Sequence, residues 1–253
     1  IKERRINIDK VLADWFYKQD LDFASLYFGE PDVTGHDHGP DSPQLKAMVQ
    51  QVDRTVGYIR ERLQQLRLTN RINVIMTADH GMTNVLRGEQ IQEILLSKIP
   101  NFSFRDIQLD YGALGMLLPK EGKLEKVYQV LKNSHPNLQV YKKHDGPARL
   151  HYSSHPRLLP LILIIFPLHY SKGDHGYDNE IMDMKAFFRA VGPDFHSDLL
   201  VEPFDLVDVY PLMCHLLKIQ PKVNDGDLEK TKEILISEGD TGGNDVHALS
   251  KCN

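Results

Sequence analysis

The chain has 253 residues, 41% of them hydrophobic and 26% charged, a globular composition that excludes wholesale disorder and fibrous repeats. Its formal net charge of -5 argues against a nucleic-acid-binding protein, which would carry a clustered basic excess. The two cysteines exclude a disulfide scaffold and a cysteine-based zinc ribbon, whereas the twelve histidines are more than a chain of this length usually carries.

The first eighty residues predict a helix, a strand, a long helix and a second strand. Apolar spacing predicts a helix over residues 6–17, and an apolar, aromatic run predicts a strand over 21–28. A polar loop is expected at 32–40, and an apolar stripe predicts a long helix from Pro43 to Leu66. Residues 72–76 then predict a strand. A strand–helix–strand unit requires a parallel pair, so we expect an α/β fold with a mostly parallel sheet and helices on both faces.

The rest of the chain continues the alternation of strands and helices. We expect strands at 114–118, 138–141 and 158–166, helices at 124–131 and 206–217, and either state at 186–191. No internal repeat and no linker divides the chain, so residues 1–228 are predicted to form part of one domain. Residues 229–253 are predicted to form a polar, flexible tail. No apolar run reaches the roughly 20 residues of a membrane helix, and we expect no signal peptide at Ile1.

Acidic and histidine residues gather where the two predicted N-terminal strands end. Asp32 and His36 follow the first strand, and Asp79 and His80 follow the second. Carboxyl ends of neighbouring parallel strands share one sheet edge, so these side chains are expected side by side. His175 lies in a third loop, between two glycines. Taken singly, each cluster is more readily explained as a hydrogen-bonded loop; taken together, they favour a metal site.

Carboxylate and imidazole ligands suit zinc without any cysteine. Five candidate ligands exceed one tetrahedral site, so we expect two zinc ions. Paired metal ions roughly 3.5–4 Å apart suit the cleavage of phosphate esters.

Three motifs of the chain resemble the ectonucleotide pyrophosphatase/phosphodiesterase family of the alkaline phosphatase superfamily. They are YFGEPDVTGH at 27–36, TADHGM at 77–82 and GDHGYDN at 173–179. The resemblance covers roughly residues 1–228. It implies an alkaline-phosphatase-like α/β fold that is incomplete at the N-terminus, with this chain as the C-terminal part of the catalytic domain.

The resemblance also implies roles for the five candidate ligands. Asp32, His36 and His175 would hold one zinc ion, and Asp79 and His80 would be ligands of the second. The family's nucleophile is a threonine that bridges both metals, and no threonine of this chain matches its motif. We therefore expect the chain to be inactive in isolation.

Finer similarities, at 101–107, 182–185 and 201–204, are to the sphingomyelin-cleaving branch of the family. They imply a zinc-dependent phosphodiesterase of phospholipase C type that converts sphingomyelin to ceramide and phosphocholine. A choline-specific glycerophosphodiesterase and a nucleotide pyrophosphatase/phosphodiesterase are the alternatives within the family. An alternative of another class is a non-catalytic zinc-binding fragment.

The expected partners follow from the same resemblance. They are a choline phospholipid substrate and a membrane surface, reached through an anchor that is not in this chain, and no nucleic acid is expected. The expected location is the extracellular face of the plasma membrane. Asn101-Phe102-Ser103 is an N-glycosylation sequon, which makes Asn101 the predicted glycosylation site of a secretory-pathway protein.

Overall fold

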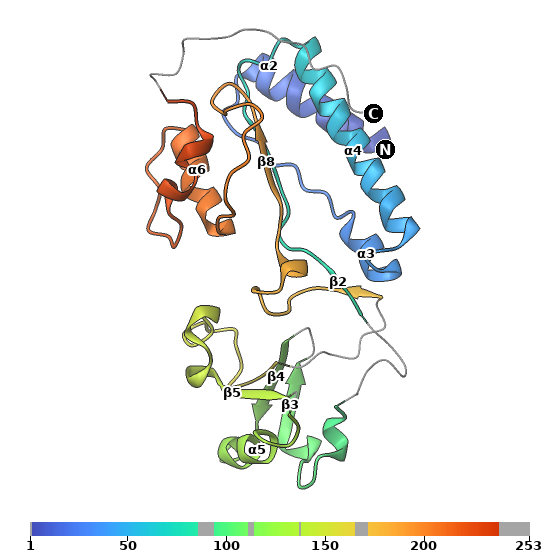
Figure 1. The fold of residues 1–253 in the computed structure, drawn as a ribbon, viewed down its shortest axis with the longest axis vertical. Coiled ribbons are helices and arrows are strands. Elements are labelled where there is room, and N and C mark those ends of the chain that lie inside the picture. The colour runs from blue at the N-terminus through green and yellow to red at the C-terminus, as the bar shows by residue number, and fades with distance from the viewer. Residues whose placement is uncertain (1, 86–93, 111–113, 137, 165–171, 238–253) are drawn as a thin grey trace. The chain divides into compact units, whose positions relative to one another are not determined.

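The computed structural model describes residues 2–85, 94–110, 114–136, 138–164 and 172–237 (Figure 1). The chain divides into two compact units. Unit 1 consists of residues 1–27, 51–79 and 186–253, and unit 2 consists of residues 28–50 and 80–185. The boundary between residues 50 and 51 lies inside one long helix, so no linker composition marks it in the sequence.

The predicted helices are confirmed, with small shifts of their ends. The helices are α1 (Lys2–Asp9), the π-helical η1 (Lys10–Phe16), α2 (Tyr17–Gln19), α3 (Asp32–His38), α4 (Pro43–Gln65), α5 (Leu124–Leu131) and α6 (Val209–Leu216). Short 3-10 turns are η3 (Leu96–Lys98), η4 (Phe104–Asp106), η5 (Lys143–Asp145), η6 (Ala148–Leu150), η7 (Met182–Met184), η8 (Leu206–Asp208), η9 (Leu228–Lys230) and η10 (Lys232–Ile234).

The strands form three sheets. The strands are β1 (Val74–Thr77), β2 (Thr83–Asn84), β3 (Ile107–Asp110), β4 (Leu114–Pro119), β5 (Gln139–Lys142), β6 (Leu161–Ile164), β7 (Gly173–Asp174) and β8 (Phe188–Val191). In unit 1, β1 pairs with β8. In unit 2, β2 pairs with β7, and a four-stranded sheet has the order β3-β4-β6-β5.

Every strand pair in the described ranges is antiparallel, which corrects the prediction of a mostly parallel sheet. That prediction depended on a strand at 21–28, which does not form. Two of its aromatic residues face solvent, with Phe23 51% and Tyr27 81% exposed. A strand requires a neighbour that completes its ladder of hydrogen bonds, and no strand of the described ranges pairs with this segment. The mixture of helices and sheets nevertheless agrees with the predicted α/β class.

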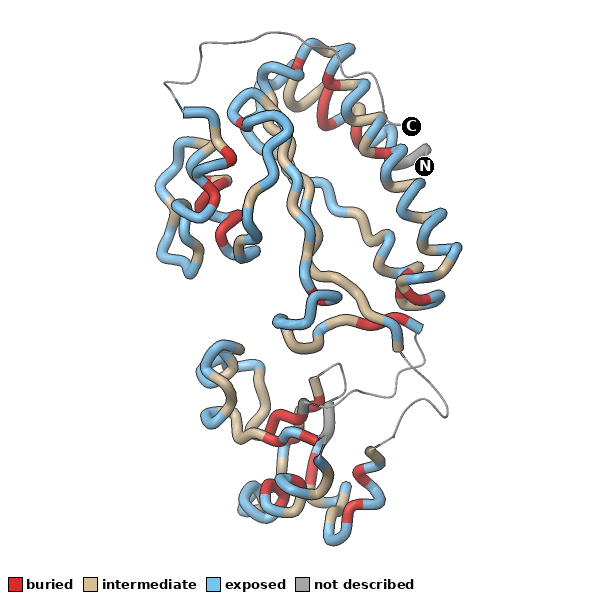
Figure 2. Tube along the Cα trace, viewed as in Figure 1, coloured by how far each residue is buried: buried red, intermediate tan, exposed pale blue. Residues whose placement is uncertain are grey.

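Three clusters of buried residues form the core. Figure 2 marks the buried residues in red along the Cα trace. In unit 1, Ile8 and Leu12 pack with Leu63 and Leu68, so the N-terminal helices lie against α4. The second cluster of unit 1 joins α6 to the β1–β8 pair and to the C-terminal turns. In unit 2, α5 covers the four-stranded sheet, and Leu131 and Leu161 are fully buried between them.

Packed structure continues past residue 228, where the flexible tail was predicted to begin. Thr231 is fully buried, and Ile234 belongs to the second cluster of unit 1. The Ile236 amide donates a hydrogen bond to the Asp194 carbonyl. Residues 238–253 of the predicted tail, and residues 165–166 of the predicted strand, lie outside the described residues.

Candidate metal centre

Asp32 and His36 lie on a helix, α3, where the sequence predicts a loop. The Glu30 carboxylate accepts a hydrogen bond from the Thr34 amide at 3.1 Å and so satisfies one of the amides that a helix start leaves free. Asp32, in the first turn, also interacts favourably with the helix dipole. Residues four apart lie on one face of a helix, so α3 presents the Asp32 carboxylate and the His36 imidazole together.

The short β2–β7 pair brings two distant segments of unit 2 to this face of α3. Thr83 pairs with Asp174, and Asn84 pairs with Gly173, so His80 and His175 approach one another just outside the pair. The Lys172 amide donates to the His36 carbonyl at 2.7 Å, which joins the start of β7 to α3.

Glycine at position 173 allows this close packing. A Cβ atom there would lie 2.5 Å from the Gly35 carbonyl oxygen and 2.9 Å from the Met82 sulfur. Gly35 packs against the end of the Met82 side chain, and a Cβ at this position would lie 2.3 Å from the Met82 sulfur, so Met82 would have to shift. The absence of a side chain at Gly173 therefore permits the close approach of β7 to α3.

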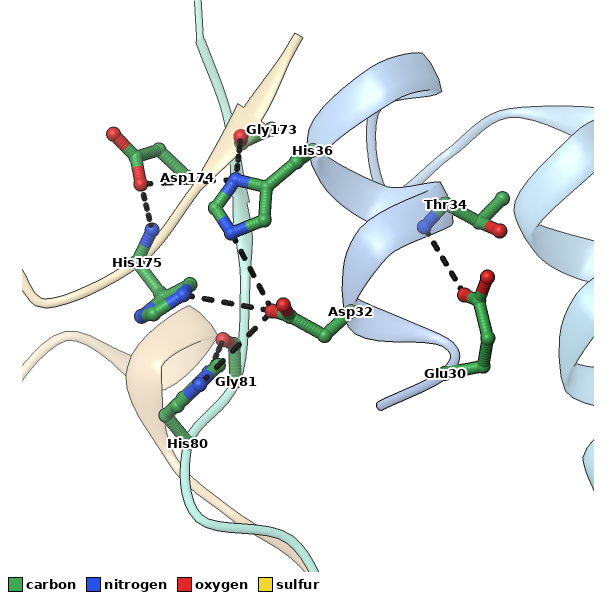
Figure 3. Close-up of polar contacts among 9 residues, drawn as sticks. All are labelled: Glu30, Asp32, Thr34, His36, His80, Gly81, Gly173, Asp174 and His175. Carbon is green, nitrogen blue, oxygen red and sulfur yellow. Dashed lines mark hydrogen bonds and ion pairs between the residues drawn. The ribbon is translucent and has the colours of Figure 1, made fainter. Parts of the chain in front are cut away.

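Three imidazole nitrogens converge on one carboxylate oxygen (Figure 3). The Nε2 atoms of His36 and His175 both lie 3.5 Å from Asp32 Oδ1, and Nε2 of His80 lies 4.0 Å from it. The His80 and His175 rings stack with centroids 3.5 Å apart. Asp32, His36 and His175 each offer one donor atom, and these atoms lie within 4.8 Å of one another.

The ring nitrogens on the far side fix how two of the histidines face the centre. Nδ1 of His36 lies 2.9 Å from the Gly173 carbonyl, and Nδ1 of His80 lies 2.9 Å from the Gly81 carbonyl. A carbonyl can only accept, so Nδ1 of each ring carries a hydrogen, and in the neutral form of the ring the lone pair is on Nε2, facing Asp32. Such outer hydrogen bonds are typical of histidines that bind metals.

The pKa of His175 is lowered below its usual value of 6.5, first by burial and then by the proximity of His80. The Asp32 carboxylate acts in the opposite direction but is the smaller effect. The His175 ring is therefore kept neutral, the form in which imidazole binds a metal.

The arrangement fits a zinc ion. Asp32 Oδ1 is buried and has no hydrogen-bond partner among the described residues, although buried carboxylate oxygens are normally paired. Tetrahedral zinc with bonds of about 2.0–2.1 Å places its ligand atoms about 3.3 Å apart, close to the 3.5 Å separations found here. One cation between Asp32, His36 and His175 would satisfy the oxygen and the lone pairs of these two imidazoles.

The structure thus brings four of the five predicted ligands together. The fifth, Asp79, is exposed and belongs to unit 1, outside the three-residue donor group. The division of the five residues between two zinc ions stays a prediction. Asn101, the predicted glycosylation site, is exposed.

Some contributors to the site were not singled out from the sequence. The Gly173 carbonyl orients His36, and the Asp174 carboxylate accepts a hydrogen bond from the His175 amide at 2.8 Å. Both residues lie in the GDHG motif. Their position next to His175 is the feature of the sequence from which a role at the site could have been predicted.

Comparison with known proteins gives a consistent family relationship. The sequence profile described as "Type I phosphodiesterase / nucleotide pyrophosphatase" matches residues 2–186. Ectonucleotide pyrophosphatase/phosphodiesterase family member 7 from Homo sapiens is 52% identical over 250 residues, which are 93% of this chain and 54% of the human protein. A bis(5'-adenosyl)-triphosphatase from Homo sapiens is 37% identical over 85% of this chain and 49% of its own length. The chain spans about half the length of these curated relatives.

Solved structures agree with the sequence relatives. Murine family member 5 superposes with a TM-score of 0.84 at 34% identity, over 93% of this chain and 64% of that one. The same murine protein, inactive and in complex with AMP, superposes with a TM-score of 0.82. These neighbours have the alkaline-phosphatase-like fold. No helix among the described residues is long and apolar enough to cross a membrane.

Proposed function

The chain belongs to the family of type I phosphodiesterases and nucleotide pyrophosphatases, and we propose that it supplies metal ligands of a zinc-dependent phosphodiesterase that acts on choline phospholipids. The proposed reaction is of phospholipase C type, with sphingomyelin converted to ceramide and phosphocholine. Support for this branch of the family comes from identities of 50–52% to family member 7, against 36–37% to human members of other branches.

The observation that carries the zinc dependence is the convergence of three Nε2 atoms on Asp32 Oδ1. In this proposal Asp32, His36 and His175 hold one zinc ion, and His80 with Asp79 contributes to the second. Bound zinc would supply a Lewis acid that neutralises charge on the phosphodiester and lowers the pKa of a nucleophile.

The chain's own residues perform the positioning in this scheme. The Gly173 and Gly81 carbonyls hold the His36 and His80 rings with their Nε2 atoms toward Asp32. Burial keeps His175 neutral, so that its lone pair is available at neutral pH. The nucleophile is proposed to come from outside these residues, because no threonine here matches the family's motif.

A second candidate is the hydrolysis of nucleotide pyrophosphates or phosphodiesters. It is favoured by the relative named bis(5'-adenosyl)-triphosphatase and by the AMP complex of murine family member 5. The metal centre would serve either reaction, because both cleave a phosphorus–oxygen bond. The substrates differ in the group beside the phosphate, a choline head in one and an adenosine in the other.

A chimera separates the two candidates. The N-terminal half of human family member 7 is joined to residues 1–253, loaded with zinc and incubated with sphingomyelin, glycerophosphocholine or bis(5'-adenosyl) triphosphate. We expect release of phosphocholine from sphingomyelin to be the fastest reaction, and the Asp32→Asn chimera to lose it. Faster release of AMP would support the second candidate, and a folded, zinc-loaded chimera without any hydrolysis would contradict both.

Assays on residues 1–253 in isolation test the alternative that the chain is a non-catalytic zinc-binding fragment. We expect residues 1–253 to bind zinc without hydrolysing any of these substrates. Zinc-dependent hydrolysis by the isolated chain would show that the nucleophile lies within it.

We also propose that the enzyme acts at the extracellular face of the plasma membrane on a membrane-borne substrate. The support is that its relatives carry the name of ectoenzymes and that the sequon residue Asn101 is exposed.

A further inference from the structure

The segment that follows His175 is held by one arginine. Arg149 lies on the 3-10 turn η6 and reaches the Asp178 carboxylate with both terminal nitrogens. Its Nη1 donates to Asp178 Oδ1 at 2.7 Å and to Asn179 Oδ1 at 3.1 Å, while Nη2 donates to Asp178 Oδ2. Asp178 Oδ1 also accepts from the Glu180 amide at 3.0 Å.

These contacts differ from an ordinary surface ion pair. Two parallel N–H···O bonds between guanidinium and carboxylate fix orientation as well as distance. The Arg149 side chain is 43% exposed and that of Asp178 is 27% exposed, so water screens the pair and its contribution to global stability is small. Its effect is local, because four hydrogen bonds act on residues 178–180.

The carboxylate keeps its charge over the working pH range. Hydrogen bonds from Arg149 and the Glu180 amide lower the pKa of Asp178 from 3.8 to about 2. Between this carboxylate and His175 lies Tyr177, a half-buried residue whose pKa is raised to about 12 by burial, so it stays neutral. The segment 175–179 is therefore held at Asp178 and Asn179, which accept the hydrogen bonds of the Arg149 guanidinium.

The position of His175 depends more on contacts of its loop than the positions of His36 and His80 do. The His36 and His80 rings each have a carbonyl at Nδ1. For the His175 ring, the described part of the chain records only the stacking on His80, the tilted contact with His36 and the approach of Nε2 to Asp32. The point from which this ring reaches the centre is set by the backbone of residue 175, which is joined to β2 through the β2–β7 pair on one side and to Arg149 through Asp178 on the other.

We propose that Arg149 is a positioning residue for the metal centre. Its hydrogen bonds to Asp178 and Asn179 hold the loop that carries His175, so that Nε2 of His175 stays directed at Asp32. The inference rests on the proposed zinc site and adds to it a residue that contacts neither the metal nor its ligands. It assigns the turn at 148–150 a role in metal affinity.

The test measures two quantities on the whole chain: zinc affinity by competition with a chromogenic chelator, and amide hydrogen exchange of residues 175–180 in the zinc-free protein. Arg149→Met is expected to weaken zinc binding about tenfold, as removal of outer partners commonly does, and to accelerate exchange in this segment. Arg149→Lys keeps the charge but loses the bidentate fork, so we expect an intermediate affinity. Asp178→Asn should behave like Arg149→Met.

Arg71→Met is the matched control, because Arg71 also pairs with an exposed carboxylate, Asp20, at 3.1 Å in unit 1. We expect its zinc affinity and the exchange of residues 175–180 to equal those of the wild type. A visible absorption spectrum of the cobalt-substituted protein that is altered in Arg149→Met but not in Arg71→Met would report a changed ligand geometry.

Two outcomes overturn the inference. In one, the zinc affinity of Arg149→Met is within twofold of that of the wild type, whatever the rate of amide hydrogen exchange in residues 175–180. In the other, exchange of residues 175–180 is unchanged in Arg149→Met. Failure of the proposed function is a separate result, in which the wild-type chain itself binds no zinc while Arg149→Met still accelerates exchange.

Discussion

A single carboxylate, Asp32, is the residue on which the metal centre depends. Its Oδ1 atom is buried without a hydrogen-bond partner in the described residues and faces three imidazole nitrogens. Residue types and short motifs predicted five ligands, Asp32, His36, Asp79, His80 and His175, and the structure places the donor atoms of Asp32, His36 and His175 within 4.8 Å of one another. They did not predict the backbone carbonyls that contact Nδ1 of His36 and of His80. Every residue has a backbone carbonyl, so residue type gives no information about which one is used.

His175 gives the metal-free protein a pH dependence with a defined sign. Its pKa is lowered in the folded state, so below pH 6.5 the unfolded state binds more protons at this ring than the folded state does. Stability should therefore fall as the pH drops from 6.5 toward the folded-state pKa, and change no further at this ring below it. Urea unfolding in the presence of EDTA, repeated from pH 7.5 to pH 5, measures this slope.

The control for this slope is His175→Gln, in which the titrating ring is gone. Its stability should depend less steeply on pH between 6.5 and 5 than that of the wild type. Equal slopes in the two proteins would show that His175 keeps an ordinary pKa.

Asn101 can be tested directly as a glycosylation site. The residue is exposed, so its amide is accessible to the glycosylation machinery. Expressed behind a secretion signal in animal cells, the chain should lose mass on treatment with N-glycosidase. Asn101→Gln should remove the contribution of this site to the mass shift, and an unchanged shift in this variant would exclude glycosylation at Asn101.

At the scale of elements, periodicity predicted the long and strongly patterned segments. The apolar stripe of α4 and the compact pattern of α5 gave bounds within one residue of those observed. The helix α3 was missed, because its sequence DVTGHDH has no apolar stripe and contains a glycine. Two contacts support it that periodicity does not detect: the local hydrogen bond from the Thr34 amide to the Glu30 carboxylate at its start, and the tertiary packing of Gly35 on Met82.

The segment 21–28 was predicted as a strand but does not form one. Its apolar and aromatic residues have the composition of a strand, but strand formation depends on a neighbour that the local sequence does not specify. The parallel sheet inferred from it was wrong for the same reason in the described residues, where β1 pairs with β8 in an antiparallel sense.

The contact between α3 and β7 should be intolerant of any side chain at residue 173. In Gly173→Ala the new methyl group would meet the Gly35 carbonyl at 2.5 Å, and backbone cannot move away as a flexible side chain can. We expect a loss of about 1–3 kcal/mol in the free energy of unfolding, as in overpacked cores, together with weaker zinc binding.

Gly57→Ala is the control, since a Cβ at this exposed position of α4 meets nothing within 4 Å. It should stabilise the protein by about 0.5–1 kcal/mol, the helix preference of alanine over glycine. Chemical denaturation measures both variants, and a Gly173→Ala protein as stable as the wild type would contradict the close packing described here.

At the scale of the whole molecule, the fold consists of two units with separate buried clusters. The metal centre belongs to unit 2, whose main core lies between α5 and the four-stranded sheet and includes none of the metal-centre residues. The sequence predicted α5 and most strands of this core. It did not predict the division into units, because one boundary falls inside α4 and leaves no trace in composition.

Leu131 tests the core of unit 2. Its side chain is fully buried in the cluster on α5, so Leu131→Ala should cost about 2–5 kcal/mol of unfolding free energy in urea denaturation. Leu118→Ala is the matched control, because Leu118 on β4 is 38% exposed and should lose less. Equal losses in the two variants would mean that α5 does not cover the sheet as described.

The central claim is that Asp32, His36 and His175 together hold a zinc ion. Zinc affinity of the metal-depleted chain, measured by chelator competition in the wild type, in Asp32→Asn and in Asp37→Asn, tests it most directly. Asp37 is exposed on the same helix and lies outside the donor group, so its variant should bind as the wild type does. Asp32→Asn keeps the shape of the side chain but removes its charge. Loss of a residue that only hydrogen-bonds a metal ligand costs up to about a hundredfold in metal affinity, so loss of the ligand charge itself should lower the zinc affinity at least about a hundredfold. A folded Asp32→Asn protein, checked by circular dichroism, that binds zinc as tightly as the wild type would contradict the assignment.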